Sequence, residues 1–165
     1  MKLPICELCS KTNALCSGDE QRLREGKITE TDVSISRLLR QLGSTYNLES
    51  ADFYKSIDLD KVVLVLTRGD VGVLIGREGK VVAEISAAVG KKVRIAEVSG
   101  DLRKTVSDIV MPARVMGINT IFREGRKIFK VRFAKSEIKQ LPVDVATLEK
   151  AMRQLFETDV SVVFE

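Results

Sequence analysis

The sequence predicts an α+β protein in which the order helix–strand–strand–helix–helix–strand occurs twice. Short aliphatic runs such as Val62–Leu66 indicate buried strands, and segments whose apolar residues recur three and four positions apart indicate helices. Residues 28–98 and 99–165 follow the same order, which indicates a weak internal repeat. We therefore expect two similar domains, 28–98 and 99–165, after a cysteine-bearing head at residues 1–27.

The first predicted domain begins with a helix over residues 28–42. Thr29 can cap this helix, Asp32 follows three residues later as the acid of a capping box, and Gly43 ends the run. Three strands are then expected, over residues 53–57, 62–66 and 92–98. The turn between the first two strands contains Asp58 and Asp60. Such a pair could bind a divalent cation, but it fits the hydrogen bonding of a turn better.

The second predicted domain repeats these elements. Asp101 can cap its first helix, which should end before Pro112 because proline keeps the preceding residue out of the helical region. The remaining elements are strands at 115–123 and 127–134, a short helix at 135–140, a longer helix from 144, and a strand at 160–164.

One stretch of the first domain points to nucleic acid. Residues 75–82 read Ile-Gly-Arg-Glu-Gly-Lys-Val-Val and lie between two helical segments. Glycines let the backbone turn sharply and approach a ligand, and the next helix points its N–H groups and positive end at the turn. Arg77 and Lys80 add positive charge, so the stretch suits a phosphate. A purely structural turn is the alternative, which the surrounding order of elements disfavours.

The pattern I-G-x-x-G-x-x-[IV] in this stretch resembles the signature of the KH nucleic-acid-binding domain. The resemblance implies that single-stranded RNA crosses the first domain with its backbone on the glycine loop. Its bases would face an aliphatic groove that includes the strand at 93–95. The RNA-binding residues implied are Ile75, Gly76, Arg77, Glu78, Gly79, Lys80 and Val82.

The second domain has no such loop, because no glycine follows Gly125 and residues 139–144 take its place. We expect this domain to bind RNA differently or not at all. Its basic residues form either a binding patch or a solvated strand surface; these are Arg123, Arg126, Lys127, Lys130 and Arg132.

Residues 109–115 read Ile-Val-Met-Pro-Ala-Arg-Val and resemble the segment that joins the two KH domains of the NusA family. The resemblance covers about residues 50–165 and implies two tandem type II KH domains, each a three-stranded sheet packed by helices. It also implies an archaeal NusA-like factor in transcription elongation or termination, with RNA polymerase or a ribonucleoprotein complex as partner. The alternatives are a ribosome-assembly or RNA-processing factor, and a protein-interaction adaptor with vestigial RNA binding.

The head carries cysteines at a spacing that resembles a zinc knuckle. The pattern C-x2-C-x6-C-x2-D comprises Cys6, Cys9, Cys16 and Asp19, with the aspartate where a fourth cysteine would stand. Tetrahedral zinc accepts thiolates and carboxylates, so a structural zinc site is one interpretation. Reduced thiols in a short head without metal are the other.

Composition narrows the function further. The chain has no histidine, which removes the commonest general base and a common metal ligand, so we expect no enzyme and no organic cofactor. Three cysteines disfavour a disulfide framework, no apolar run has the length of a membrane span, and residues 1–6 do not resemble a signal peptide. These features predict a cytoplasmic protein, and the net charge of +4 is compatible with a polyanionic partner.

Overall fold

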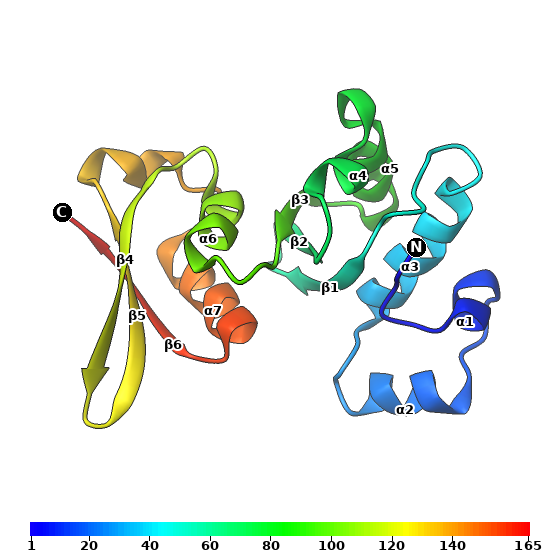
Figure 1. Cartoon of the computed structure of the whole chain (residues 1–165), viewed down its shortest axis with the longest axis horizontal. Helices are drawn as coiled ribbons and strands as arrows, with labels where there is room; N and C mark the ends of the chain where they lie inside the picture. The colour runs from blue at the N-terminus through cyan, green and yellow to red at the C-terminus, as the bar shows by residue number, and fades with distance from the viewer. The chain divides into compact units, whose positions relative to one another are not determined.

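The computed structural model describes all of residues 1–165, which divide into two compact units, Met1–Val98 and Ser99–Glu165. Each unit combines helices with one three-stranded sheet, which confirms the expected α+β class (Figure 1). No helix has both the length and the apolar character that crossing a membrane requires.

Unit 1 contains five helices, one 3-10 turn and three strands. In chain order they are α1 (Glu7–Lys11), α2 (Ser17–Arg24), α3 (Glu30–Leu42), β1 (Phe53–Asp58), β2 (Val62–Thr67), α4 (Val71–Ile75), η1 (Arg77–Gly79), α5 (Lys80–Val89) and β3 (Lys92–Glu97). The sheet has the order β1-β2-β3, with β1 antiparallel and β3 parallel to the central β2. The parallel step requires a crossover, which α4, η1 and α5 provide between β2 and β3.

The core of unit 1 lies between this sheet and the helices α3, α4 and α5. Its buried residues include Ile35 and Leu39 of α3, Val63 and Val65 of β2, and Ile85 of α5. Residues on one face of β2 therefore meet apolar stripes of the helices. This packing fixes α4 and α5, and with them the loop that joins them.

The predicted capping box at the start of α3 is present. The Thr29 hydroxyl accepts a hydrogen bond from Asp32 N (3.2 Å), and Asp32 Oδ2 accepts one from Thr29 N (2.9 Å). The other oxygen of Asp32, Oδ1, accepts bonds from both the amide and the hydroxyl of Ser56, each at 2.6 Å. Because Ser56 lies on β1, one buried carboxylate caps the helix and also ties it to the sheet.

The turn between β1 and β2 uses its aspartates as turn residues. Asp58 Oδ1 accepts the N–H of Asp60 (2.9 Å), and Asp60 has a φ of +72°. The ammonium of Lys91 donates to both oxygens of Asp58 at 2.9 Å. The hydrogen bond from Lys91 holds the pKa of Asp58 below its ordinary value of 3.8.

We expect Asp58→Asn to remove part of the acid sensitivity of unit 1. A lowered folded-state pKa stabilises the fold above the ordinary value of 3.8, and this contribution is lost as the pH falls through the folded-state pKa. The effect at neutral pH should be about 0.5 kcal/mol, because the pair is partly exposed. Urea unfolding from pH 7 to pH 2 measures it. Asp60→Asn is the control, and an equal change in pH dependence there would contradict the assignment.

Unit 2 follows with the same succession of elements. They are α6 (Leu102–Val110), β4 (Val115–Arg123), β5 (Arg126–Phe133), η2 (Lys135–Gln140), α7 (Val145–Phe156) and β6 (Asp159–Phe164). β4 pairs antiparallel with β5, and β5 pairs parallel with β6, as in the sheet of unit 1. Val131 and Phe133 of β5 are buried, as are Leu148 and Met152 of α7, so α7 covers one face of this sheet.

Candidate nucleic-acid interface and metal site

The glycine loop joins α4 to α5 through three backbone conformations that favour glycine. Gly76 has φ +76° and ψ +169°, Glu78 has φ +55°, and Gly79 has φ +72° with ψ +18°. The Gly79 N–H donates to Gly76 O at 3.1 Å, which closes a tight turn. Of the three loop positions with positive φ, two are therefore occupied by glycine and the third by Glu78.

Gly76 is also required by packing. A Cβ built on it would lie 2.4 Å from Val81 Cγ2 and 2.9 Å from the backbone nitrogen of Val81. Val81 is buried in the core beneath the loop. Any side chain at position 76 would push the loop away from α5, whereas a Cβ at Gly79 would meet only Val82, at 3.8 Å.

The loop presents charge and an uncapped helix end to solvent. Arg77, Glu78 and Lys80 are exposed, and α5 begins after Gly79 without a side-chain cap for its N–H groups. The positive end of a ten-residue helix thus remains available to an anion. Ile75 is 36% exposed beside the loop, and Val82 is half-buried.

The expected groove wall at residues 93–95 is less accessible than the sequence suggested. Val93 and Ile95 are each 9% exposed and belong to the core of unit 1. The apolar contacts available next to the loop therefore come from Ile75 and Val82.

Comparison with protein families identifies the domain that contains this loop. The family model described as "KH domain" matches residues 43–111, a range that contains the whole loop and the sheet of unit 1. Residues 43–111 form a KH domain. KH domains bind single-stranded nucleic acid across such a loop, so RNA binding in general is the activity that this domain indicates.

The comparisons with curated proteins and with solved structures give information on the fold alone. No curated protein matches the chain. Among solved structures, "Crystal structure of APE1850" matches with a TM-score of 0.55 and 23% sequence identity, and the alignment covers 77% of this chain and 96% of that one. The shared fold thus extends beyond the KH domain at 43–111.

The corresponding connection in unit 2 is built differently from the KH loop. η2 leads to Asp144, whose carboxylate accepts the Thr147 N–H at 3.0 Å and the Thr147 hydroxyl at 2.6 Å. An aspartate therefore caps the N-terminus of α7, where α5 has a bare glycine. A negative side chain at this helix end competes with phosphate, so the N-terminus of α7 is less open to an anion than that of α5.

The basic residues of the β4–β5 hairpin are divided unevenly between the two faces of the sheet. Alternation and register place four of them on the sheet face away from α7; these are Arg123, Arg126, Lys130 and Arg132. Lys127 lies on the opposite face, with its ammonium 4.9 Å from the centroid of the Phe129 ring. Arg132 is also paired with Glu165 at 3.4 Å.

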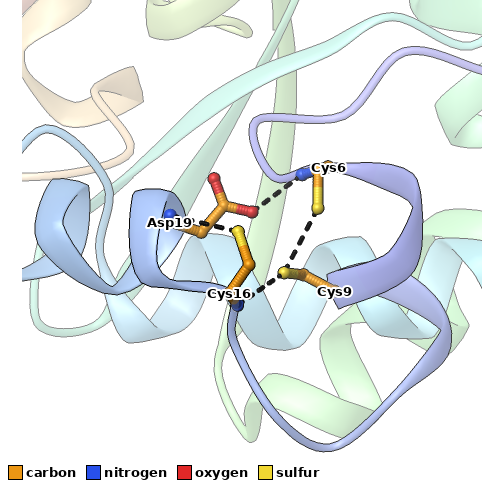
Figure 2. A group of neighbouring side chains, drawn as sticks. All are labelled: Cys6, Cys9, Cys16 and Asp19. Atoms are coloured by element: carbon orange, nitrogen blue, oxygen red, sulfur yellow. Dashed lines mark hydrogen bonds between the residues drawn. The ribbon is translucent and has the colours of Figure 1, made fainter.

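The cysteine pattern of the head folds into a compact donor cluster. The ligand atoms of Cys6, Cys9, Cys16 and Asp19 all lie within 4.8 Å of one another, and the four side chains converge (Figure 2). A tetrahedral zinc site with bonds of about 2.3 Å places sulfur ligands about 3.8 Å apart. These four residues are therefore close enough to bind one metal ion.

Two short helices position these donors. Cys6 precedes α1 and Cys16 precedes α2, each as the residue before the first turn. The Cys9 sulfur accepts the Cys16 N–H at 3.1 Å, and the Cys16 sulfur accepts the Asp19 N–H at 3.4 Å. Such N–H···S bonds orient sulfur ligands and stabilise thiolates. Sequence reasoning found the donors but not α1 and α2. Helix α1 has only five residues and α2 has a single large apolar residue, Leu23, so neither shows a helical period.

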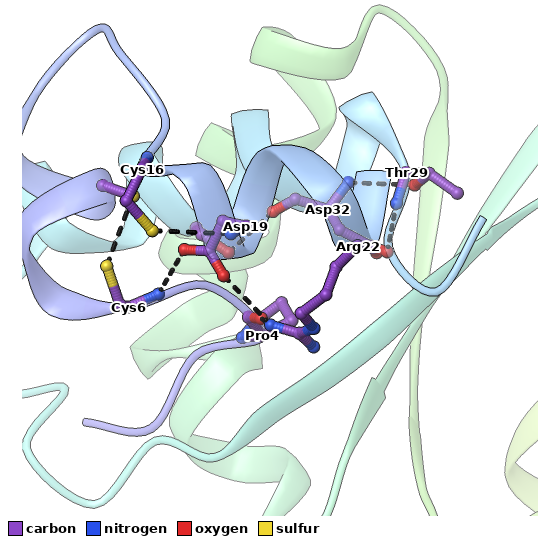
Figure 3. A network of polar contacts seen from close by, with 9 residues as sticks. Pro4, Cys6, Cys16, Asp19, Arg22, Thr29 and Asp32 are labelled. Atoms are coloured by element: carbon purple, nitrogen blue, oxygen red, sulfur yellow. Dashed lines mark hydrogen bonds and ion pairs between the residues drawn. The ribbon is translucent and has the colours of Figure 1, made fainter. Parts of the chain in front are cut away.

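Asp19 is held in place from two sides. Its Oδ2 accepts the Cys6 N–H at 2.9 Å, and its Oδ1 accepts Arg22 Nη1 at 3.2 Å, which in turn donates to Pro4 O at 2.6 Å (Figure 3). Asp19 is only 5% exposed. Burial alone would raise its pKa, but the hydrogen bonds from Cys6, from the Cys9 thiol and from Arg22 hold the pKa below its usual range.

The thiols of Cys9 and Cys16 differ in acidity. Burial raises the pKa of the Cys9 thiol to about 12. The N–H of Asp19 and the Cys9 thiol lower the pKa of Cys16, which is exposed. Since metal ligands must be deprotonated, a bound dication would offset the cost of a buried Cys9 thiolate.

Proposed function

We propose that this protein binds single-stranded RNA at the KH loop Gly76–Gly79 and acts as a NusA-like factor in transcription elongation or termination. The observation that carries the proposal is the KH domain at residues 43–111, with its exposed glycine loop at the uncapped start of α5. The segment at 109–115, which resembles the NusA linker, supports the more specific role.

In this proposal about four nucleotides cross the domain. The sugar-phosphate backbone lies on Gly76–Gly79, close to the N-terminus of α5, with Arg77 and Lys80 supplying charge. Ile75 and Val82 contact the bases through dispersion, so sequence preference is modest. Glu78 repels phosphate, and affinity from this loop alone is therefore low.

We infer that unit 2 is a second, degenerate type II KH domain. Its order of elements and its mixed sheet support this, because β4, β5 and β6 pair as β1, β2 and β3 do. Without a glycine loop, it positions the RNA or recruits a partner rather than holding the backbone. We also infer that the protein is not an enzyme, since histidine is absent and Asp58 is engaged by Lys91.

We propose zinc for the cysteine cluster. Three sulfurs and one carboxylate complete a tetrahedral set, which leaves no position open for substrate and so indicates a structural ion. The ion would join α1 and α2 in a head that buries little apolar surface of its own. Its small apolar cluster is shared with the start of the first domain and is formed by Ile5, Cys9, Ile28 and Val33. Its role would be to hold the head against α3.

The double variant Arg77→Asp with Glu78→Asp tests the RNA site. It reverses one positive charge at the loop, and we expect RNA affinity to fall about tenfold at low salt, with a shallower dependence on salt. Fluorescence anisotropy with a labelled single-stranded RNA over a salt series measures both. Lys61→Asp makes the same change in net charge at the exposed β1–β2 turn and serves as the control. Equal losses in the two variants would refute the site.

A pull-down from native lysate tests the cellular role. We expect RNA polymerase to be recovered with the protein, in part after ribonuclease treatment. Recovery of small ribosomal subunits instead would favour a ribosome-assembly factor. Capture of a protein partner by a chain that binds no RNA would favour the adaptor.

A further inference from the structure

A polar pocket of about 220 Å³ lies in unit 1 between the end of α1, with the turn that follows it, and the C-terminal half of α3. The segment 10–13 forms one wall and α3 forms the other, and α1 packs on α3 beside it. The lining residues are Ser10, Lys11, Thr12, Asn13, Arg37, Arg40 and Gln41. All of them are polar, three are cationic, and none is acidic.

The two arginines are fixed by bonds that leave most of their donors unused. Arg37 Nε donates to Cys9 O at 3.1 Å, and Arg40 Nε donates to Ser10 Oγ at 3.0 Å. A guanidinium has five N–H donors, so the Nη groups of both remain to be satisfied. Arg37 Nη2 is buried and has no hydrogen-bond partner in the protein. A buried donor of this kind calls for an acceptor.

The charge around the pocket is positive. Lys11 is paired with Glu7 at 2.6 Å, which leaves the two arginines without a carboxylate partner. The planar guanidinium of arginine binds anions with several acceptor oxygens bidentately, and phosphate is the anionic group that RNA carries.

We propose that this pocket binds a phosphate group of the RNA that the KH loop holds, an inference that rests on the proposed function. The lining offers cations and hydrogen-bond donors but no aliphatic or aromatic side chain on which a nucleotide base could stack, so the pocket suits a phosphate group. The head would then have a role in RNA binding, because it supplies one wall of the pocket. Residues 10–13 belong to the connection between Cys9 and Cys16, so a metal bound by these cysteines would fix one wall of the phosphate site.

The sharpest test adds a negative charge without removing a hydrogen bond. Gln41 is exposed at the pocket, and Gln154 is exposed on α7 of unit 2. We expect Gln41→Glu to weaken RNA binding about fivefold at low salt, because a like charge a few ångströms from a phosphate costs on the order of a factor of five to ten. Gln154→Glu, with the same charge change, should leave RNA affinity within twofold of the parent protein.

A second variant and a direct binding measurement complete the test. Arg40→Gln should weaken RNA binding and reduce the dependence of RNA affinity on salt by the amount expected for the loss of about one phosphate contact. Thermal unfolding shows whether the head of this variant remains folded. Amide chemical shifts of residues 10–13 should move when the RNA is added. If they move with inorganic phosphate but not with RNA, the pocket serves a small phosphorylated molecule and the RNA assignment is wrong.

The two proposals fail in different ways. If Gln41→Glu and Gln154→Glu bind RNA equally while the KH-loop variant loses affinity, the pocket proposal is overturned and the RNA site stands. If the parent protein binds no RNA, the proposed function falls and the pocket proposal falls with it.

Discussion

Replacing Gly76 by alanine should lower the free energy of unfolding of unit 1 by about 3 kcal/mol. The backbone at φ +76° and ψ +169° is in a region that only glycine adopts readily, and a side chain there costs about 1–3 kcal/mol. The added Cβ would also lie 2.9 Å from the backbone nitrogen of Val81, which cannot rotate away. Overpacking of this kind costs about 1–3 kcal/mol more.

Urea unfolding followed by tyrosine fluorescence measures this effect in unit 1 alone. Both tyrosines, Tyr46 and Tyr54, belong to unit 1, and the chain has no tryptophan. Gly79→Ala is the matched control. Its φ of +72° with ψ +18° lies in the left-handed helical region, and its Cβ would meet only Val82 at 3.8 Å, so about 1 kcal/mol is expected. Equal losses at the two glycines would show that Val81 does not restrict the loop.

Local signals in the sequence predicted most of the fold. The Thr29–Asp32 capping box, the aliphatic run of β2 and the Asp101 cap of α6 each depend on residues within a few positions of one another. Such local signals can be recognised in the sequence without knowledge of the tertiary structure. The hydrogen bonds from Ser56 to Asp32 join residues 24 apart, and no local pattern announces them.

The candidate site was predictable to the same extent. The spacing of Gly76 and Gly79 identified the loop, and the spacing of the cysteines identified the donors. Periodicity could not decide whether Val93 and Ile95 face a groove or the core, because both environments favour aliphatic residues. Similarly, only the strand register shows that Arg123 of β4 lies on the same face of the sheet as Arg126 of β5.

Removal of zinc should lower the free energy of unfolding of the intact protein by about 4 kcal/mol when free zinc exceeds its Kd a thousandfold. The ion would bind the folded head and not the unfolded chain, because the four donors come from positions up to 13 residues apart in the sequence and converge only in the folded head. Protein purified without a tag should contain about one zinc per chain, as metal analysis would show.

Cys9→Ser isolates the contribution of the metal. Cys9 is 1% exposed, so the substitution also places a hydroxyl in the small apolar cluster of the head. Comparing parent and variant with and without a chelator separates the two costs. The chelator should destabilise the parent and have no effect on the variant, and the difference that remains in chelator is the cost of packing. A chelator effect of equal size in both proteins would show that Cys9 is not a ligand.

Asp19→Cys should act in the opposite direction and bind zinc more tightly than the parent. A fourth thiolate is a softer and stronger zinc ligand than a carboxylate, although the variant loses the bonds that Asp19 accepts from Cys6 and Arg22. Zinc affinity by competition with a chromophoric chelator is therefore the measurement, since stability combines both effects. Asp19→Ala, which removes a ligand, should bind zinc more weakly than either. If parent, Asp19→Cys and Asp19→Ala bind zinc equally, the carboxylate serves only to fix Cys6 and Arg22, and the metal has three protein ligands.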